Sequence, residues 1–156
     1  NNLEKIINNI VGDAIVKEVM SLKLAVKLIE TVEEKAAEMG LAVVVAVSDA
    51  SGRPIAVHCM DGAYHGSFDV AVNKTYTSTA FQMSTAKLSR LCQPGQDLYG
   101  LQFSNNGKVM ILGGGEPLMV GKTMIGALGV SGGSAQEDSD LAAYGASALK
   151  EVIKCL

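Results

Sequence analysis

The stretch LAVVVAVSDASGRPIAVHCM, residues 41–60, decides the fold class of this chain. Its first half is a short, continuous run rich in β-branched residues, which is typical of a strand that is covered on both faces. The residues DASG, 49–52, form a turn signal, and RPIAVHCM, 53–60, is a second candidate strand. Two strands joined by so short a turn predict a hairpin. Pro54 is tolerable at the start of an edge strand.

Helical patterns surround this hairpin, because apolar residues recur at helical spacing on both sides of it. The predicted helices cover residues 22–39, 68–83, 85–91 and 135–156. Two further strands are predicted at KVMIL, 108–112, and at TMIGALGVSG, 123–132, with NNG, 105–107, as a hairpin tip. This order of elements predicts an α+β fold, with a central antiparallel sheet of about five strands and helices packed on it.

Residues 1–20 form a predicted N-terminal amphipathic extension, and residues 21–156 form a single domain. A one-sided apolar pattern marks the extension as a helix. Its members are Leu3, Ile6, Ile7, Ile10 and Val11. We expect this helix either to dock on the domain or to contact another subunit. Ser21 is the expected N-cap of the helix that follows, and Gly40 is its expected stop.

Composition excludes several functions. The net charge is −3, there is no long basic run, and aromatic residues make up only 4% of the chain, so nucleic-acid binding is disfavoured. No apolar run approaches the length of a membrane span, and acidic residues interrupt the apolar stretch at the N-terminus, which argues against a signal peptide. The three cysteines lack the spacing of a zinc site or of a disulfide framework, so we expect a cytoplasmic protein.

Glycine is concentrated between Met110 and Gly133. Neither a dinucleotide fingerprint nor a phosphate-binding P-loop is present, so we interpret these glycines as positions that need positive φ or a close approach to the backbone. The approaching object is a ligand, a helix or a neighbouring chain. Gly132, Gly133 and Ser134 precede the last predicted helix, where free amides suit a carboxylate, although an ordinary strand-to-helix turn is the favoured interpretation.

No catalytic set stands out. The chain has two histidines and no GxSxG motif, and its carboxylates show no pairing. His58 lies within a predicted strand, where a hydrogen-bonded structural role is favoured over a ligand role. His65 lies in the loop DGAYHGS, where a surface role and an iron ligand are equally favoured. Asp69 and Lys74 are each interpreted as a solvated charge.

Three blocks together resemble the GlcG/HbpS-like family, and especially the C-terminal domain of PduO and its stand-alone relatives. The blocks are residues 53–81, 93–118 (QPGQDLYGLQFSNNGKVMILGGGEPL) and 125–149 (IGALGVSGGSAQEDSDLAAYGASAL). The resemblance runs from about Leu22 to the C-terminus. It implies a profilin-like fold and oligomers, often octamers. It also implies haem binding, and a link to a corrinoid adenosyltransferase whose chemistry belongs to another domain.

The resemblance implies a tetrapyrrole site, for which the residues offer candidates. Haem is the expected cofactor, with a corrinoid as the less favoured one, and His65 is the candidate iron ligand. An apolar slot would be walled by residues near it, and Lys74, Lys87 or Arg90 would meet the propionates. The candidate cofactor-binding residues are His65, His58, Met60, Tyr64, Phe68, Lys74, Gly113, Gly114 and Gly115.

The sequence therefore predicts a non-enzymatic accessory protein that binds haem or a corrinoid at an oligomer interface, linked to coenzyme-B12-dependent diol or glycerol utilisation. Two alternatives stay open. One is a small-molecule enzyme that acts on a glycol or an aldehyde. The other is a structural or chaperone-like partner of a dehydratase that uses the N-terminal helix. A dehydratase or an adenosyltransferase is the candidate partner, and a bacterial microcompartment is a second candidate location besides the cytoplasm.

Overall fold

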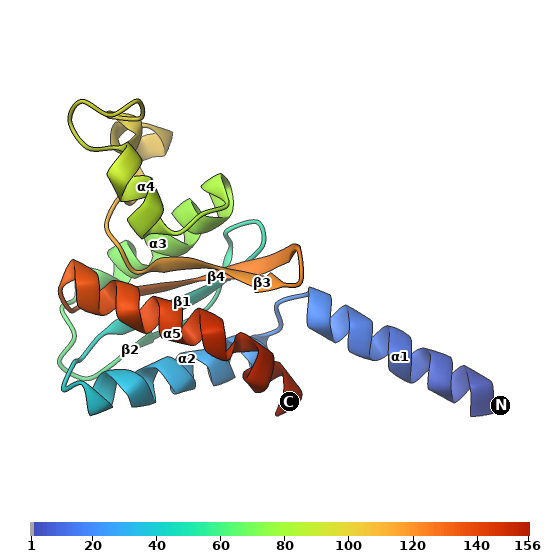
Figure 1. Cartoon of the computed structure of the whole chain (residues 1–156). Helices are drawn as coiled ribbons and strands as arrows, with labels where there is room; N and C mark the ends of the chain where they lie inside the picture. Colours follow the sequence, from blue (N-terminus) through green and yellow to red (C-terminus); the bar gives the residue numbers. More distant parts are fainter. Residues whose placement is uncertain (1) are drawn as a thin grey trace.

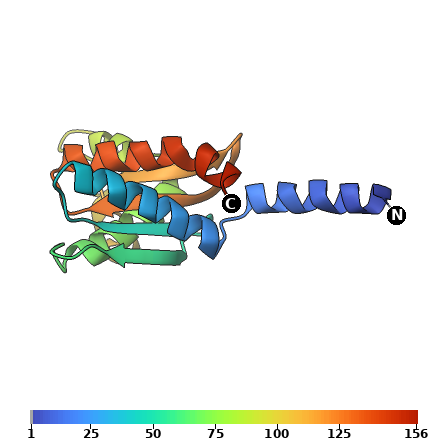
Figure 2. The same cartoon turned by 90° about the horizontal axis from the view of Figure 1, so that it is seen from below.

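The computed structural model describes residues 2–156 and leaves the side chains of residues 11–18 undescribed. Helices α2 and α5 cover one face of one antiparallel sheet and α3 covers the other, with α4 standing beyond α3 (Figures 1 and 2). The helices are α1 (Asn2–Glu18), α2 (Leu22–Glu38), α3 (Ser67–Phe81), α4 (Thr85–Leu91) and α5 (Ala135–Lys154). The strands are β1 (Val44–Asp49), β2 (Pro54–Cys59), β3 (Gly115–Val120) and β4 (Thr123–Ser131). The α+β prediction is confirmed.

The strands pair antiparallel in the order β2-β1-β4-β3. Strand β1 is central and buried because it pairs with both β2 and β4, which explains its continuous run of β-branched residues. The predicted β1–β2 hairpin is confirmed, and Pro54 begins the edge strand β2, where its missing N–H costs no ladder hydrogen bond.

The main core lies between the sheet and the pair α2 and α5. Alternate residues of β1 face this core, and the apolar stripe of α2 packs against them. Ser21 caps α2 as predicted, because its Oγ accepts a hydrogen bond from the amide of Leu24. Gly40 follows the helix with φ of +71°, a conformation that glycine adopts without strain.

The expectation of about five strands is wrong, because the sheet has four. Residues 108–112, predicted as a strand, are irregular and pack beside α3 and α4. The amide of Met110 donates to Oγ1 of Thr77 at 2.8 Å, so a helix side chain binds the backbone amide that a strand would have paired. The predicted hairpin tip at 105–107 is a short 3₁₀ helix (Asn105–Gly107), which follows another (Leu101–Phe103). The observed hairpin joins β3 to β4 through Gly121 and Lys122.

Helix α1 extends away from the domain, as Figures 1 and 2 both show. Its described apolar residues are largely exposed: Ile6 and Ile7 are 48% exposed and Ile10 is 63% exposed. The side chain of Val11, also part of the predicted stripe, lies outside the described residues. Between the docked and the undocked arrangements that the sequence left open, this single chain has the undocked one.

Candidate functional site

The loop around His65 is a structured surface turn. It joins β2 to α3, and the amide of Ala63 donates to the carbonyl of Met60 while that of Ser67 donates to the carbonyl of Tyr64. His65 and Tyr64 are exposed, the latter by 75%, and Phe68 is 44% exposed. Met60 packs instead against the main core. The loop thus displays an imidazole beside two aromatic rings, and it does not line any of the three grooves described below.

His58 is a hydrogen-bonded histidine, as its place in a strand predicted. Its Nδ1 lies 2.7 Å from Oε1 of Glu33 on α2. The contact ties the edge strand β2 to that helix, because Glu33 and His58 are both half-buried. A carboxylate that contacts Nδ1 fixes the orientation of the ring, and Nε2 is the ring nitrogen that takes no part in this contact.

The three consecutive glycines, 113–115, are buried against the protein's own side chains and backbone. At Gly114, where φ is +120°, an added Cβ would lie 2.8 Å from Nζ of Lys74 and 2.9 Å from Cβ of Asp138. At Gly115 it would lie 2.6 Å from a methyl carbon of Thr85. The surrounding helices therefore approach this backbone closely. A helix was one of the three alternatives that the sequence left open, beside a ligand and a neighbouring chain.

Lys74 is not a solvated charge, and that interpretation is wrong. Its side chain is 1% exposed, and its Nζ donates to the carbonyl of Val130 at 2.7 Å and to Oδ2 of Asp138 at 3.1 Å. Burial lowers the pKa of Lys74, and the nearby Asp138 partly offsets that effect. Burial likewise raises the pKa of Asp138, against the opposing influence of Lys74 and the amide of Gly133. The ammonium group joins α3, β4 and α5 beneath the triple glycine, so in this chain it does not reach the surface.

The amides before α5 do bind carboxylates, but both carboxylates come from the chain itself. The amide of Gly133 donates to Oδ1 of Asp138 at 2.8 Å. Ser134 and Glu137 form a capping box, in which each side chain accepts a hydrogen bond from the other residue's backbone amide. The ordinary strand-to-helix turn is therefore the arrangement found, and these groups are satisfied without a ligand.

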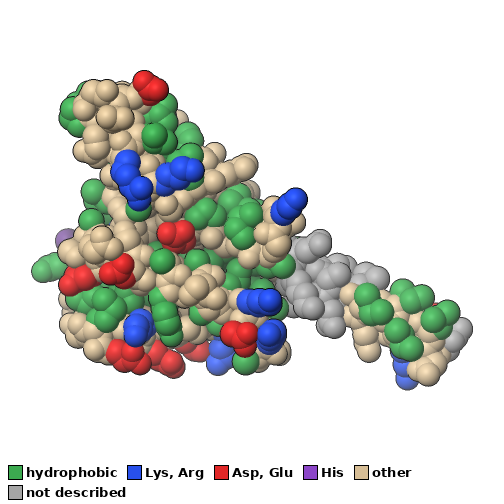
Figure 3. Space-filling model, in the orientation of Figure 1, with side chains coloured by type: hydrophobic (Ala, Val, Ile, Leu, Met, Phe, Trp, Pro, Cys, Tyr) green, Lys and Arg blue, Asp and Glu red, His purple; other side chains and the backbone are tan. Residues whose placement is uncertain are grey.

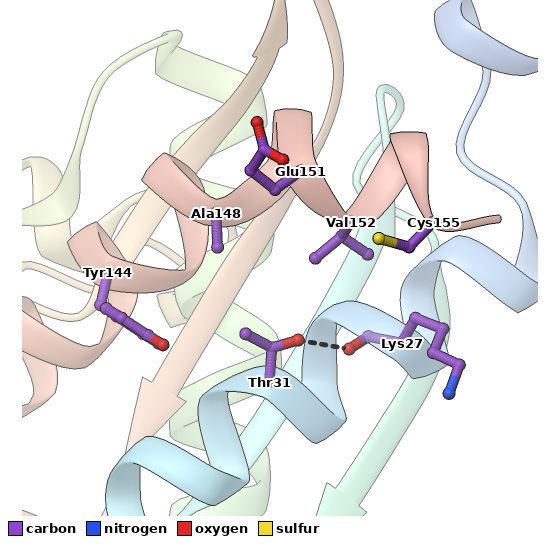
Figure 4. A pocket seen from close by; sticks show the side chains of 7 residues that line it. All are labelled: Lys27, Thr31, Tyr144, Ala148, Glu151, Val152 and Cys155. Carbon is purple, nitrogen blue, oxygen red and sulfur yellow. Dashed lines mark hydrogen bonds between the residues drawn. The ribbon is translucent and has the colours of Figure 1, made fainter.

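Two grooves flank α5. The first, of about 430 Å³, lies between α2 and α5 (Figure 4). It is lined by Lys27, Thr31, Tyr144, Ala148, Glu151, Val152 and Cys155. The hydroxyl of Thr31 donates to the carbonyl of Lys27 within its own helix, and the Lys27 amine lies 3.2 Å from Glu30, so two of its polar groups already have partners. The second groove, of about 300 Å³, lies between the end of α5 and the β3–β4 hairpin and includes Lys150.

The third and largest groove, of about 710 Å³, runs along the edge strand β3, and we call it the β3 groove. The end of α3, the start of α4 and the β3–β4 hairpin form its walls. Its lining residues are Gln82, Met83, Ser84, Lys87, Glu116, Pro117, Met119, Lys122 and Met124. Figure 3 shows this face, with basic side chains beside α4 and at the hairpin tip and apolar side chains over the hairpin. Its size falls in the range of small-molecule sites.

The charged groups of the β3 groove lack protein partners in the described part of the chain. Glu116 is half-buried and burial raises its pKa, yet its carboxylate makes no hydrogen bond or ion pair there. The amines of Lys87 and Lys122 are likewise unpaired among the described residues, whereas Lys27 and Lys35 each pair with a glutamate on α2. Lys87 was expected to meet a propionate of a tetrapyrrole held near His65. The structure puts it in this groove, away from the β2–α3 loop.

Sequence reasoning missed Glu116, Lys122 and the methionines of the β3 groove. The only signal was a lone glutamate that follows three glycines and precedes the apolar residues of a strand.

Among residues 2–156 no cluster of three or more His, Cys, Asp or Glu residues could hold a metal ion. Nor does any helix of the described chain have the length and the apolar character that crossing a bilayer demands.

These features define a small α+β domain with a groove lined by apolar and charged side chains and with an exposed histidine in its β2–α3 loop. The chain belongs to the HbpS-like family: the family model described as haem degrading protein HbpS-like matches residues 20–147. A 15.0 kDa protein from the dhaT-dhaS intergenic region of Citrobacter freundii is 39% identical over 123 residues, which are 79% of this chain and 87% of that protein.

The corrinoid adenosyltransferase PduO of Salmonella typhimurium is 39% identical over 109 residues, which are 70% of this chain. This match spans only 32% of PduO, so the activity in that name does not follow for this chain. Among solved structures, Klebsiella pneumoniae ORFY matches with a TM-score of 0.82 and 36% identity, over 84% of this chain and 90% of that one. A PduOC–haem complex matches with a TM-score of 0.79 and 35% identity, over 83% and 94%.

Proposed function

We propose that this protein binds haem or a related tetrapyrrole as a non-enzymatic accessory protein, in an oligomer, in a cell that uses diols or glycerol. The likeness to a PduOC–haem complex and the family's description support the ligand. The likeness to PduO and to a protein encoded between dhaT and dhaS supports the metabolic setting. A cytoplasmic or microcompartment location and an adenosyltransferase partner belong to the same proposal.

The observation that carries this proposal within the chain is the exposed imidazole of His65. Its side chain has no hydrogen-bond partner among the described residues, and Tyr64 and Phe68 expose aromatic surface beside it. A neutral imidazole is a common axial ligand of haem iron, and exposed aromatic rings suit a flat apolar macrocycle. His65 therefore remains the proposed iron ligand. His58 is the competing imidazole, because Glu33 orients its ring.

A haem titration of the purified chain tests the ligand and the iron ligation together. We expect a Soret band that saturates at one haem per chain, or one per two chains if two copies share the iron. His65→Ala is expected to shift the Soret band and weaken binding by more than tenfold, with His58→Ala as the matched imidazole control. Saturable binding that is identical in wild type, His65→Ala and His58→Ala would refute imidazole ligation, and absence of saturable binding would refute the ligand.

Helix α1 keeps a second role open, that of a contact with another protein. Ile10 lies about one turn from Ile6 and Ile7 on an exposed helix, which is the pattern of a helix that packs on a partner. A dehydratase or a second copy of this chain is the proposed partner. Light scattering of the full chain and of residues 19–156 tests this, because loss of the helix is expected to change the number of subunits in the assembly. An unchanged number of subunits, together with unchanged co-purification of a dehydratase, would refute it.

A further inference from the structure

We propose that the β3 groove binds a zwitterionic small molecule, an α-amino acid with a bulky apolar side chain, whose ammonium group meets Glu116 and whose carboxylate meets Lys87. The apolar side chain of this ligand lies against the methionines of the groove. The site is separate from the β2–α3 loop. The inference therefore goes beyond the proposed function and does not depend on haem binding.

Glu116 is a half-buried acid that nothing in the described chain compensates. It follows the buried triple glycine on β3, and its side chain lines the groove. Burial raises its pKa, and among the described residues no donor or cation meets its carboxylate to offset that effect. A partly desolvated carboxylate without a donor is costly, and a charged N–H donor compensates it most strongly. Glu116 therefore favours a ligand that carries an ammonium group.

Lys87 lies at the same end of the groove as Glu116. The hydroxyl of Thr85, the first residue of α4, accepts a hydrogen bond from the amide of Gly115 at 2.8 Å. Glu116 directly follows Gly115, and Lys87 comes one residue after the neighbour of Thr85. Both charged side chains line the groove, yet in the described chain no ion pair joins them. Two opposite charges that stand at one end of a groove without pairing suit a head group that carries both signs.

This pattern of charges disfavours simpler ligands. A dianion would be repelled by Glu116, and an organic cation would leave Lys87 without a partner and be repelled by it. A neutral apolar molecule would bury Glu116 further and offer it no donor. A free α-amino acid carries both an ammonium group and a carboxylate at neutral pH, so it pairs with both groups.

The rest of the groove suits an apolar side chain. Met119 and Met124 are direct cross-strand partners, so their side chains stand next to each other at the edge of the sheet. Met83 adds a third thioether from the turn between α3 and α4. Methionine side chains adapt to irregular shapes and make favourable contacts with aromatic rings. With about 710 Å³, the groove has room for an aromatic amino acid.

Calorimetric titration of the full chain with three related probes tests the head-group contacts. The probes are L-phenylalanine, its N-acetyl derivative, which lacks the ammonium group, and its amide, which lacks the carboxylate. We expect wild type to bind L-phenylalanine about tenfold more tightly than the N-acetyl derivative, because the contact with Glu116 is half-buried. We expect a preference of about two- to fivefold over the amide, because Lys87 is exposed.

Each variant should remove one of these preferences and keep the other. Glu116→Gln is expected to bind L-phenylalanine no more tightly than the N-acetyl derivative, and Lys87→Met is expected to bind L-phenylalanine and the amide alike. The matched control is Lys122→Met, which removes a lysine from the same groove at the tip of the β3–β4 hairpin. Its backbone lies about 20 Å along the hairpin from that of Glu116, so we expect all three affinities to stay within about twofold of wild type.

Two results would overturn the proposal. One is that wild type shows no saturable binding of L-phenylalanine. The other is that Glu116→Gln and Lys87→Met rank the three probes as wild type does, or that Lys122→Met loses as much affinity as Lys87→Met. Selective loss of one preference in each variant supports the proposal, and circular dichroism checks that every variant is folded. Haem binding by wild type is measured separately, so either result leaves the proposed function to its own test.

Discussion

Breaking the buried ion pair between Lys74 and Asp138 should cost a large part of the stability of this fold. Lys74→Met keeps most of the length of the side chain but leaves a carboxylate that is almost fully buried beside the amide of Gly133. Asp138→Asn leaves the ammonium group with a neutral amide in place of the carboxylate, besides the carbonyl of Val130 at 2.7 Å. Breaking one partner of a buried pair costs about 3–5 kcal/mol, which is a third or more of the stability of many domains.

Urea unfolding of the single and double variants, at one protein concentration, measures this effect. In Lys74→Met the carboxyl group can take up a proton, because burial already raises the pKa of Asp138, so we expect a loss near the low end, about 3 kcal/mol. The double variant buries no charge and should lose less than the sum of the singles by about 2–3 kcal/mol. The control is Lys35→Met, at an exposed pair on α2, where we expect about 0.5 kcal/mol or less.

Two results would refute this reasoning. One is a loss below about 1 kcal/mol in both single variants, which would mean that the pair is hydrated rather than buried. The other is strict additivity in the double variant, because groups in direct contact must show a coupling energy.

Three further predictions follow from the structure. Gly114→Ala should destabilise the protein by about 2–4 kcal/mol in urea unfolding, because its Cβ would crowd Lys74 and the carbonyl of Val130. Gly107→Ala, at φ +73° with open space around it, should lose only about 1 kcal/mol. Equal losses in the two variants would contradict the packing argument. Glu116→Gln should raise the melting temperature most at pH values above the folded pKa of Glu116. Burial raises that pKa, so the wild type carries the cost of the charged form there and loses this cost as pH falls towards the ordinary value of 4.5; a difference independent of pH would contradict it. Removal of residues 1–18 should change the free energy of unfolding of the domain by less than about 0.5 kcal/mol, because α1 makes few contacts with it; a larger loss would show that α1 docks.

The hairpin, the four helices of the domain and the N-terminal helix were predictable because each depends on local chemistry. Each element is marked by a pattern that is local in the sequence: a run of β-branched residues, a turn signal or an apolar stripe. The short helix Thr85–Leu91 was predicted within its observed bounds. The prediction of a strand at KVMIL was wrong for a tertiary reason. A strand needs a partner strand, whereas the amide of Met110 donates its hydrogen bond to Thr77 of α3.

The candidate site was predictable only in part. His58 was correctly expected to be hydrogen-bonded, but no sequence pattern names Glu33, which lies 25 positions earlier, as its partner. Lys74 was taken for a solvated charge because lysine is rarely buried, although it shares the helical spacing of Ala71 and Ser78, which are also buried. The assignment of His65 to iron stays a prediction.

The sequence by itself determined the fold class, the hairpin, the approximate extent of the helices and the family, because these follow from periodicity and motifs along the chain. Only the tertiary structure decided that Lys74 meets Asp138 64 positions away and that Glu116, Lys87 and Lys122 share one groove. The physical reason is burial. Whether a charge is solvated, paired or left facing a groove depends on which elements pack against it, and that depends on the folded chain as a whole.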